Sequence, residues 1–443
     1  MKLIRRWRAR RLQPEIEEQQ AFYAQDWSPD DIRAWQLAKF NEQWESIRRN
    51  VPYYSRLAAE RDLPVQFDSW EQFRHRMPVI DRETVQSHRL ELASTEKAPD
   101  FQRVTGGSTA EPVRIPAWSS ERKYERRDFW YARGWYDITP ADRLFLLWGH
   151  SHIFGDGLSG WWGKTKRKLK DAMLGYHRVD AYDLSDEALW QAGTSLLQTD
   201  PDYLLGYSKA LDQFARVNAE RKAEFQTLDL KAAIATAESF PQPNSPQVIE
   251  DVFGAPVAME YGAVETGPMA YQRPDGDFQI FWRHYKIEGE KTNLLDGAYE
   301  IYITSLYPRC FPLVRYRIGD MVPENPNAAA FDQTLPSIIG RSNDYITLPN
   351  GRRIHSVALI HAVQEVEGIQ ALQIHQKSED DITVYYQSSG EGSLADPKID
   401  AMREGLSRLD LSLKKVGIQS VSSLEQTPAG KQKRVVREGA ERE

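Results

Sequence analysis

The segment Thr105-Gly106-Gly107-Ser108-Thr109-Ala110-Glu111-Pro112 contains two adjacent glycines followed by two hydroxyl side chains. Glycine lets the backbone turn where a Cβ would clash and leaves amide N–H groups open to an anion, to which the hydroxyls can also donate. The flanking residues Val104 and Val113 resemble strand ends, so the segment is predicted to be a hairpin loop; a Walker loop, in contrast, opens a helix. We interpret it as a phosphate clamp. On these residues alone, an ordinary polar turn remains the alternative.

Four apolar segments further along the chain each end in small, aromatic or acidic residues. Their alternation with helical patterns over residues 101–260 predicts parallel α/β units. Since ligands of open α/β sheets lie beyond the carboxyl ends of the strands, we expect a binding site where these segments end. In chain order they are Arg143–Trp148 before Gly149–Gly157, Tyr203–Tyr207, Ala232–Ala237 before Glu238, and Val257–Glu260 before Tyr261–Gly267.

The remaining regions differ in pattern from these units. Residues 1–100 have helical periodicity and are expected to cover part of a sheet, whereas residues 275–335 are predicted to be antiparallel β structure. After Gly340-Arg341 we predict a small α+β domain of ordinary domain size. Its expected elements are a Pro349–Gly351 turn, a helix over 357–366, and paired strands over 372–376 and 382–387. The predicted fold class is α/β, with mixed sheets, a β region and a small second domain.

Composition excludes several classes of protein. A chain of 443 residues is too long for one core, and 41% hydrophobic residues suffice for a globular protein. The net charge of −7 argues against a nucleic-acid binder. The single cysteine, Cys310, excludes an internal disulfide and a cysteine-based metal cluster, so we expect a cytoplasmic location.

The chain begins with a basic segment, Met1–Arg11, that runs into acidic residues from Glu15 instead of an apolar stretch. It therefore does not resemble a signal peptide, and no segment has the roughly 18 apolar residues that cross a bilayer. We expect no integral membrane association. The basic segment can touch an anionic membrane surface, but a solvated first helix is the more common reason for such a pattern.

Single residues after the predicted strands suit a nucleotide. Glu265 can hold Mg²⁺ against phosphates, the Tyr261 ring can lie on adenine, and Asp320 can accept hydrogen bonds from ribose hydroxyls. Lys431, after a proline–glycine turn, can neutralise charge on a transferring group. For each residue taken alone, a structural or surface role is the alternative.

Two further clusters have weaker signals. His150 and His152 have strand spacing, but only Asp156 lies nearby as a third ligand, so lining of a pocket is favoured over a metal site. The basic run Lys164–Lys170 is typical of a solvated helix face, although it can also hold a polyanion such as a coenzyme A phosphate.

Taken in this order, the segments resemble the ANL superfamily of adenylate-forming enzymes, in its phenylacetate–coenzyme A ligase and CapK-like branch. The resemblance extends over most of the chain. It rests on Val51-Pro52-Tyr53-Tyr54, Thr105–Pro112, Tyr261–Glu265, Gly297–Glu300, Pro312–Asp320, Gly340–Asp344 and Gly430-Lys431.

The resemblance implies an N-terminal domain over residues 1–342 that binds ATP and an acid. It also implies a mobile domain over 343–443, with Asn343 as the hinge, that carries the catalytic lysine Lys431. Glu265 would be the second catalytic residue and would bind Mg²⁺. Glu238 and Tyr261 would flank adenine, Asp320 would bind ribose, and Arg341 would contact nucleotide oxygens. The full set expected at ATP is Thr105, Gly106, Gly107, Ser108, Thr109, Glu238, Tyr261, Gly262, Asp320 and Arg341.

The chain departs from the family pattern at three places. The phosphate loop ends in Ala110-Glu111-Pro112 where a lysine is common, which puts an acidic residue near phosphates. Asn343 occupies the hinge position, which is often aspartate. Some relatives carry a cysteine-rich zinc site after the Tyr-Gly motif, but Met269–Gln272 contains no cysteine, so no zinc is expected.

We therefore predict ATP- and Mg²⁺-dependent formation of acyl-AMP from a carboxylic acid, followed by acyl transfer. An aryl acid and coenzyme A are the favoured substrates; transfer to an amine or hydroxyl, or a non-catalytic nucleotide-binding role, are the alternatives. The protein would act on small molecules as a monomer or homodimer. The acid is expected near Trp148, His150, Phe154, Tyr207 and Ala237.

Overall fold

The front of the chain is helical, as predicted. The computed structural model describes residues 2–104, 114–149, 158–181, 183–328, 332–335, 337–341, 344–363, 366, 368–388, 392–425 and 433–437. Ser28 and Asp31 form a capping box at the start of the second helix, in which each side chain accepts a hydrogen bond from the backbone N–H of the other residue. Pro29 occupies the first helical position, where the N–H that proline lacks would have no partner within the helix. The helices are α1 (Lys2–Tyr23), α2 (Pro29–Asn50), α3 (Pro52–Glu60), α4 (Trp70–Arg76) and α5 (Arg82–Ser87).

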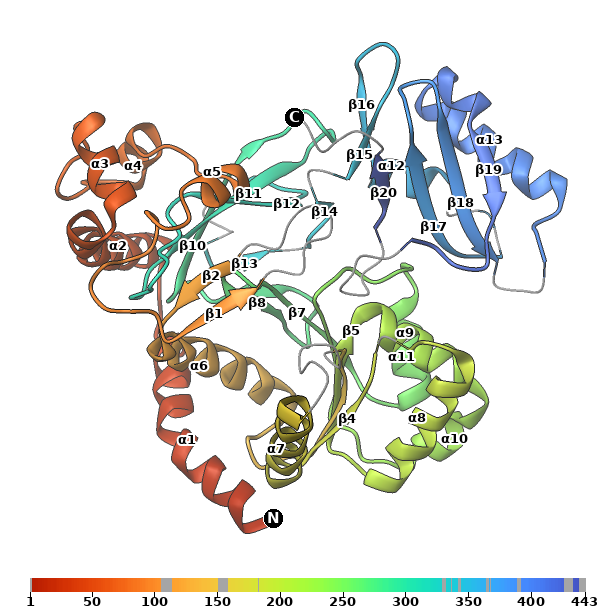
Figure 1. The fold of residues 1–443 in the computed structure, drawn as a ribbon, viewed down its shortest axis with the longest axis horizontal. Helices are drawn as coiled ribbons and strands as arrows, with labels where there is room; N and C mark the ends of the chain where they lie inside the picture. Colours follow the sequence, from red (N-terminus) through yellow and green to blue (C-terminus); the bar gives the residue numbers. More distant parts are fainter. Residues whose placement is uncertain are drawn as a thin grey trace.

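Helices α2 to α5 cover a β region, as the pattern of residues 1–100 led us to expect. Gln36 of α2 donates to the carbonyl of Trp282 at 2.9 Å, and Ile80 forms a bridge with Tyr316. Rings of Phe40, Trp44 and other aromatic residues fill the space between α2, α4 and the sheet. Figure 1 shows α2, α3 and α4 beside β10 and β11.

The centre of the molecule is an eight-stranded sheet with the order β13-β9-β8-β7-β6-β5-β3-β4. The five strands from β7 to β4 in this order pair in parallel and the remaining ones are antiparallel, so the parallel prediction for residues 101–260 is confirmed. The strands are β3 (Leu144–Leu147), β4 (Tyr176–Val179), β5 (Tyr203–Tyr207), β6 (Ala233–Thr236), β7 (Val257–Ala263), β8 (Gly267–Gln272), β9 (Phe278–Ile280) and β13 (Thr334–Leu335).

Both faces of this sheet are buried, which explains its continuous apolar strands. Along β3, Leu144 and Leu146 belong to one hydrophobic core, whereas Phe145 and Leu147 point to the other. The second core is closed by four helices and the first by α1, α6 and the front helices (Figure 1). The helices on the sheet are α6 (Arg122–Arg133), α7 (Leu158–Leu174), α8 (Asp186–Thr199), α9 (Ser208–Val217), α10 (Lys222–Phe225) and α11 (Ser245–Phe253).

A second, antiparallel sheet has the order β10-β11-β12-β14. The predicted antiparallel region is confirmed, with two differences: Phe278–Ile280 joins the large sheet, and β10 was not predicted because its buried positions include Lys286 and Glu288. These charges pair with Asp332 and Arg315. The strands are β10 (Tyr285–Lys291), β11 (Tyr299–Ser305), β12 (Tyr316–Val322) and β14 (Gly340–Arg341).

The predicted hairpin around the glycine-rich stretch is present. Strand β1 (Phe101–Val104) pairs antiparallel with β2 (Arg114–Ala117), and Val104 stands opposite Arg114. The loop itself, residues 105–113, lies outside the described residues.

Residues 346–435 contribute to a hydrophobic core of their own. The Pro349–Gly351 turn joins a hairpin, the predicted helix is present up to Val363, and a four-stranded sheet has the order β19-β18-β17-β20. The elements are β15 (Tyr345–Thr347), β16 (Arg353–His355), α12 (Ser356–Val363), β17 (Ile369–Gln376), β18 (Ile382–Ser388), α13 (Asp396–Leu409), β19 (Gly417–Ser420) and β20 (Val435–Arg437). Within the described residues, no helix is both long and apolar enough to span a bilayer.

Candidate active site

Three residues predicted at ATP meet where the two sheets approach each other. The hydroxyl of Tyr261, on β7, donates to Asp320 Oδ2 at 2.7 Å, and Arg341 Nη1 lies 3.3 Å from Asp320 Oδ1. Asp320 and Arg341 stand opposite each other in the β12–β14 ladder, which fixes their separation. Burial and the adjacent Asp320 carboxylate raise the pKa of Tyr261 well above its usual value, so the phenol stays a donor.

Glu265 lies in the tight turn between β7 and β8, close to this group. Charges of Asp320 first and Glu265 second raise the pKa of Arg341, so the Glu265 charge acts on the guanidinium that pairs with Asp320. Two buried donors hold the turn from behind: Tyr285 Oη donates to the Thr266 carbonyl at 2.5 Å, and Arg309 donates to the Glu265 carbonyl. The turn is therefore anchored by its backbone, and the Glu265 side chain is left at the site.

Arg309 belongs to a buried group of charges that also contacts the glycine-rich hairpin. Its Nε lies 3.7 Å from Glu121 Oε2, and Arg103 Nη2, one residue before the end of β1, lies 3.2 Å from the same carboxylate. Arg103 also pairs with Glu125. This group ties the strand that enters the loop at residue 105 to the turn that carries Glu265.

Glu238, predicted beside adenine, follows β6 in a bend where Ala237 has a φ of 74°. The Ser208 hydroxyl donates to the Glu238 carbonyl at 2.6 Å and holds this bend against the start of α9. Burial lowers the pKa of the neighbouring Lys209 and the charge of Glu238 opposes that shift. Lys209 was not predicted, since a single lysine after a strand has no motif to mark it.

A second unpredicted cation, Arg434 of residues 346–435, is affected by the charge of Glu238 at this edge of the sheet. Burial lowers the pKa of its guanidinium, and the carboxylates of Asp344 first and Glu238 second oppose that shift. Burial in turn raises the pKa of Asp344, against the charges of Arg434 and Arg341. The charges of Lys209 and Glu238, of Glu238 and Arg434, and of Arg434 and Asp344 thus act on one another, and Arg341 pairs with Asp320.

The residues expected at the acid are only partly described. The rings of Trp148 and Tyr207, which follow β3 and end β5, have centroids 4.5 Å apart, and Ala237 follows β6 on the same edge of the sheet. Because these strands are parallel and adjacent, their carboxyl ends lie together. His150, Phe154, Thr105–Thr109, Asn343 and Lys431 lie outside the described residues.

The carboxylate of Glu265 suits a Mg²⁺ that is held mainly by phosphates. Among the described residues, no group of three His, Cys, Asp or Glu side chains can enclose a metal, and no side chain pairs with this carboxylate. Mg²⁺ in nucleotide sites takes one or two carboxylates and fills its other positions with phosphate oxygens and water. The single half-buried Glu265 fits that pattern.

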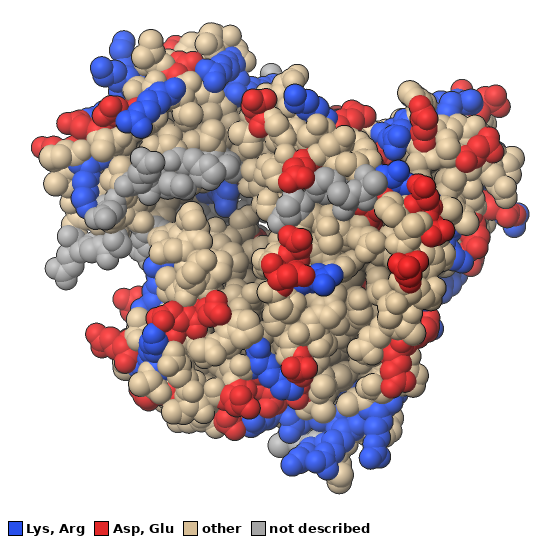
Figure 2. Space-filling view, turned by 180° about the vertical axis from the view of Figure 1, so that it is seen from behind, with Lys and Arg blue, Asp and Glu red and all other residues tan. Residues whose placement is uncertain are grey.

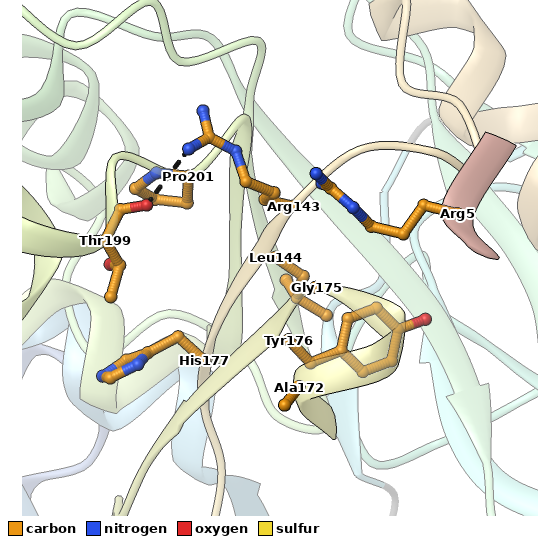
Figure 3. A pocket seen from close by; sticks show the side chains of 9 residues that line it. All are labelled: Arg5, Arg143, Leu144, Ala172, Gly175, Tyr176, His177, Thr199 and Pro201. Atoms are coloured by element: carbon orange, nitrogen blue, oxygen red, sulfur yellow. Dashed lines mark hydrogen bonds between the residues drawn. The ribbon is translucent and has the colours of Figure 1, made fainter. Parts of the chain in front are cut away.

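A pocket of about 200 Å³ lies at the opposite edge of the sheet, beside the first residues of β3 and β4. Its two arginines already have partners: Arg143 pairs with Asp200 and Asp202, and Arg5 donates to the Ala141 carbonyl at 3.2 Å. None of the predicted site residues that the structure describes lines it. Figure 3 shows Arg5, Arg143, Leu144, Ala172, Gly175, Tyr176, His177, Thr199 and Pro201 around this space.

Comparison with known proteins agrees with the sequence resemblance. No family model matches the chain. Protein CapK of Staphylococcus aureus is 23% identical over 363 residues, 80% of this chain and 78% of that protein. The crystal structure of 2-hydroxyisobutyryl-CoA ligase in its postadenylation state, in complex with R3-HIB-AMP, superposes with a TM-score of 0.67 at 17% identity, covering 91% of this chain and 89% of the ligase.

The same ligase in its thioesterification state, with 2-HIB-AMP and CoA, gives a TM-score of 0.56 at the same coverage. The chain has the fold of the adenylate-forming superfamily, and its predicted resemblance to the CapK-like branch of that superfamily is confirmed.

Proposed function

We propose that the protein is an ATP-dependent ligase that joins a carboxylic acid to AMP and then transfers the acyl group to an acceptor. The observation that carries the proposal is the convergence of Tyr261, Glu265, Asp320 and Arg341 at one edge of an adenylate-forming fold. In this reaction an oxygen of the acid attacks the α-phosphorus, and pyrophosphate leaves. The acyl-AMP carbonyl is then attacked by the acceptor, and AMP leaves.

The residues of the site have distinct tasks in the proposed reaction. Asp320, fixed by Tyr261 and Arg341, accepts hydrogen bonds from the ribose, and Glu238 lies beside the adenine. Glu265 would hold Mg²⁺, which supplies charge neutralisation at the phosphates when it is bound. Arg341, 45% exposed beside Asp320, can contact nucleotide oxygens. Positioning and charge stabilisation account for most of the rate enhancement in such reactions.

For the acid we propose a flat apolar or aryl carboxylate. The support is the Trp148–Tyr207 ring pair at the carboxyl ends of β3 and β5, because aromatic walls bury a flat ring with favourable contacts. Coenzyme A is the proposed acceptor. The structurally similar 2-hydroxyisobutyryl-CoA ligase binds CoA in its thioesterification state, and the exposed basic face of α7 in this chain suits the phosphates of that molecule.

We further propose two domains that meet at residue 343. The separate hydrophobic core of residues 346–435 supports this boundary, and the larger TM-score to the postadenylation state supports an arrangement suited to the first half-reaction. Lys431 would approach the acyl-phosphate oxygens from this domain; the charge of Glu238 that acts on Arg434, three residues later, supports this placement.

The test is acid-dependent exchange of labelled pyrophosphate into ATP, with a panel of aryl, hydroxyaryl and short aliphatic acids. Wild-type protein should exchange with at least one acid. The Glu265→Gln variant should lose at least about a hundredfold in exchange rate, in the range typical for removal of one charge-stabilising group. Glu324→Gln, at an exposed carboxylate, is the matched control and should keep wild-type activity.

Absence of exchange across the panel, from folded protein that binds ATP, would contradict the proposal. The acceptor is identified separately by AMP release: coenzyme A should raise it well above hydrolysis when the preferred acid is supplied. A rise with an amine or an alcohol instead of coenzyme A would assign the protein to amide or ester formation.

A further inference from the structure

The first turns of α1 carry an unusual concentration of positive charge. Residues 2–11 contain six cations and no acidic residue, in a chain whose net charge is −7. Cations at a helix N-terminus are disfavoured by the helix dipole, and this first turn contains no acidic residue to offset them. The charge therefore does not serve the stability of the helix. The cations are Lys2, Arg5, Arg6, Arg8, Arg10 and Arg11.

Contacts to the rest of the protein define the inner face of this helix segment. Arg5 donates to the Ala141 carbonyl at 3.2 Å and packs closely over Gly175. The guanidinium of Arg8 lies 5.4 Å from the ring centres of both Trp130 and Tyr176. These two arginines are engaged with the protein, so they fix which side of α1 faces outward.

The outer face presents apolar side chains to solvent. Leu3 is 79% exposed, Ile4 42% and Trp7 60%, although these are among the most costly side chains to leave in water. Leu3 and Trp7 are four residues apart and so share one face of the helix. Arg11 lies over the Trp7 ring at 5.5 Å, and Arg6 and Arg10 are exposed beside it.

The location of this face leaves it open to a large partner. Figure 1 shows α1 beginning at the lower edge of the molecule, beyond the helices that cover the large sheet. Figure 2 shows Lys and Arg side chains gathered at that same edge. Helix α7 contacts α1 and adds exposed lysines at 166, 168 and 170 around Leu169, which is 62% exposed.

We propose that this surface, the outer face of α1 over residues 2–11, docks the protein on an anionic lipid bilayer. A basic helix with exposed Trp, Leu and Ile lies in the interface, with its apolar side chains among the upper acyl chains and its cations on the headgroups. Each cation near an anionic membrane contributes about 1 kcal/mol. A nucleic acid would satisfy the cations but would leave Leu3, Ile4 and Trp7 in water, so the apolar residues favour a membrane.

The test is cosedimentation of the full chain with vesicles. Wild-type protein should bind phosphatidylcholine vesicles that contain about a third phosphatidylglycerol, and should not bind phosphatidylcholine alone. Reversing two exposed charges, Arg6→Glu with Arg10→Glu, should weaken the partition coefficient at least about twentyfold, since each lost cation removes roughly a factor of five. Trp7→Ser should weaken it about fivefold through loss of the apolar anchor.

The controls change equivalent residues elsewhere. Lys414→Glu with Lys415→Glu gives the same change in net charge at another exposed site, and Leu411→Ser removes an apolar side chain that is 82% exposed. Both should bind vesicles like the wild type. Equal binding by all variants, or no binding by the wild type, would overturn the proposal. Displacement from vesicles by a DNA duplex, together with unchanged binding by Trp7→Ser, would assign the surface to nucleic acid instead.

Discussion

Arg309 holds the turn that carries Glu265, although it is not among the residues proposed to contact the nucleotide. Its guanidinium side chain is 1% exposed and holds the carbonyl of Glu265. Arg309→Met should shift the Mg²⁺ dependence of pyrophosphate exchange about tenfold to higher concentration, because the turn loses a charged donor worth roughly 1.5–3 kcal/mol. Arg309→Lys, which can still donate to that carbonyl, should recover much of the loss.

The control for this prediction is Arg221→Met. Arg221 is also buried, but it donates to the Trp190 carbonyl of α8 and pairs with the half-exposed Glu224, so its loss removes a buried guanidinium with polar partners without touching the site. Both Met variants should be destabilised, because each removes a buried guanidinium and leaves its hydrogen-bond acceptors without that donor. A shift in Mg²⁺ dependence of equal size in both variants would show that Arg309 has only a structural role.

At the scale of single residues, the sequence led to predictions only for residues that belong to a motif. Tyr261 and Asp320 were predicted at one nucleotide, and they form a hydrogen bond although they are 59 residues apart. Arg309, Lys209 and Arg434 were not predicted. A buried cation is recognised only by its partners, and the partners of Arg309 lie 44 residues away at Glu265 and 188 residues away at Glu121.

The β7–β8 turn is the element on which the arrangement of the site depends most. A Cβ on Gly262 would lie 2.4 Å from the Gly267 carbonyl and 2.9 Å from Pro268 Cα, both backbone atoms that cannot rotate away. Gly262→Ala should therefore disturb the pairing of β7 with β8 and lower the free energy of unfolding by about 1–3 kcal/mol. Urea titration measures this change.

Gly134→Ala is the matched control for the turn. Its φ of −60° suits alanine, and the nearest atom to its Cβ would be a flexible side chain at 3.9 Å. This variant should unfold within about 0.5 kcal/mol of the wild type. If Gly262→Ala were equally stable, the backbone at the β7–β8 turn would be able to relax, and the close approach would not restrict Glu265.

Helices and strands were predicted correctly where the period of the hydrophobic residues and their position in the chain both indicated the same kind of element. The predicted parallel strands β3, β5 and β6 are apolar runs whose two faces are buried, whereas the parallel edge strand β4, with His177 and Arg178, is half-buried and was not predicted. Strand β10 was not predicted because two of its buried positions are charged. Lys286 forms a salt bridge with Asp332, and Glu288 forms one with Arg315. Such pairs join residues that a local window cannot connect. The sequence pattern of β10 is therefore polar although the strand lies in a core.

For the whole molecule, the central prediction concerns the two half-reactions. If Lys431 acts only in adenylation, Lys431→Ala should reduce pyrophosphate exchange by orders of magnitude, while transfer from chemically supplied acyl-AMP should continue near the wild-type rate. The neighbouring Lys433, which pairs with Glu425, supplies the control Lys433→Ala, which should support both steps. Equal loss of both half-reactions in Lys431→Ala would refute a role confined to adenylation.

Cys310 gives this chain a practical property of a different kind. It is the only cysteine, it is fully buried, and burial raises the pKa of its thiol to about 11, so little reactive thiolate exists at neutral pH. The native protein should therefore react very little with maleimide labels. Cysteines could be introduced at two exposed positions, Glu250 on α11 and Lys414 in residues 346–435. They would be labelled with a fluorophore pair, while Cys310 would remain unlabelled. The separation of the two proposed domains would then become directly visible in single molecules as ATP, acid and acceptor are added in turn.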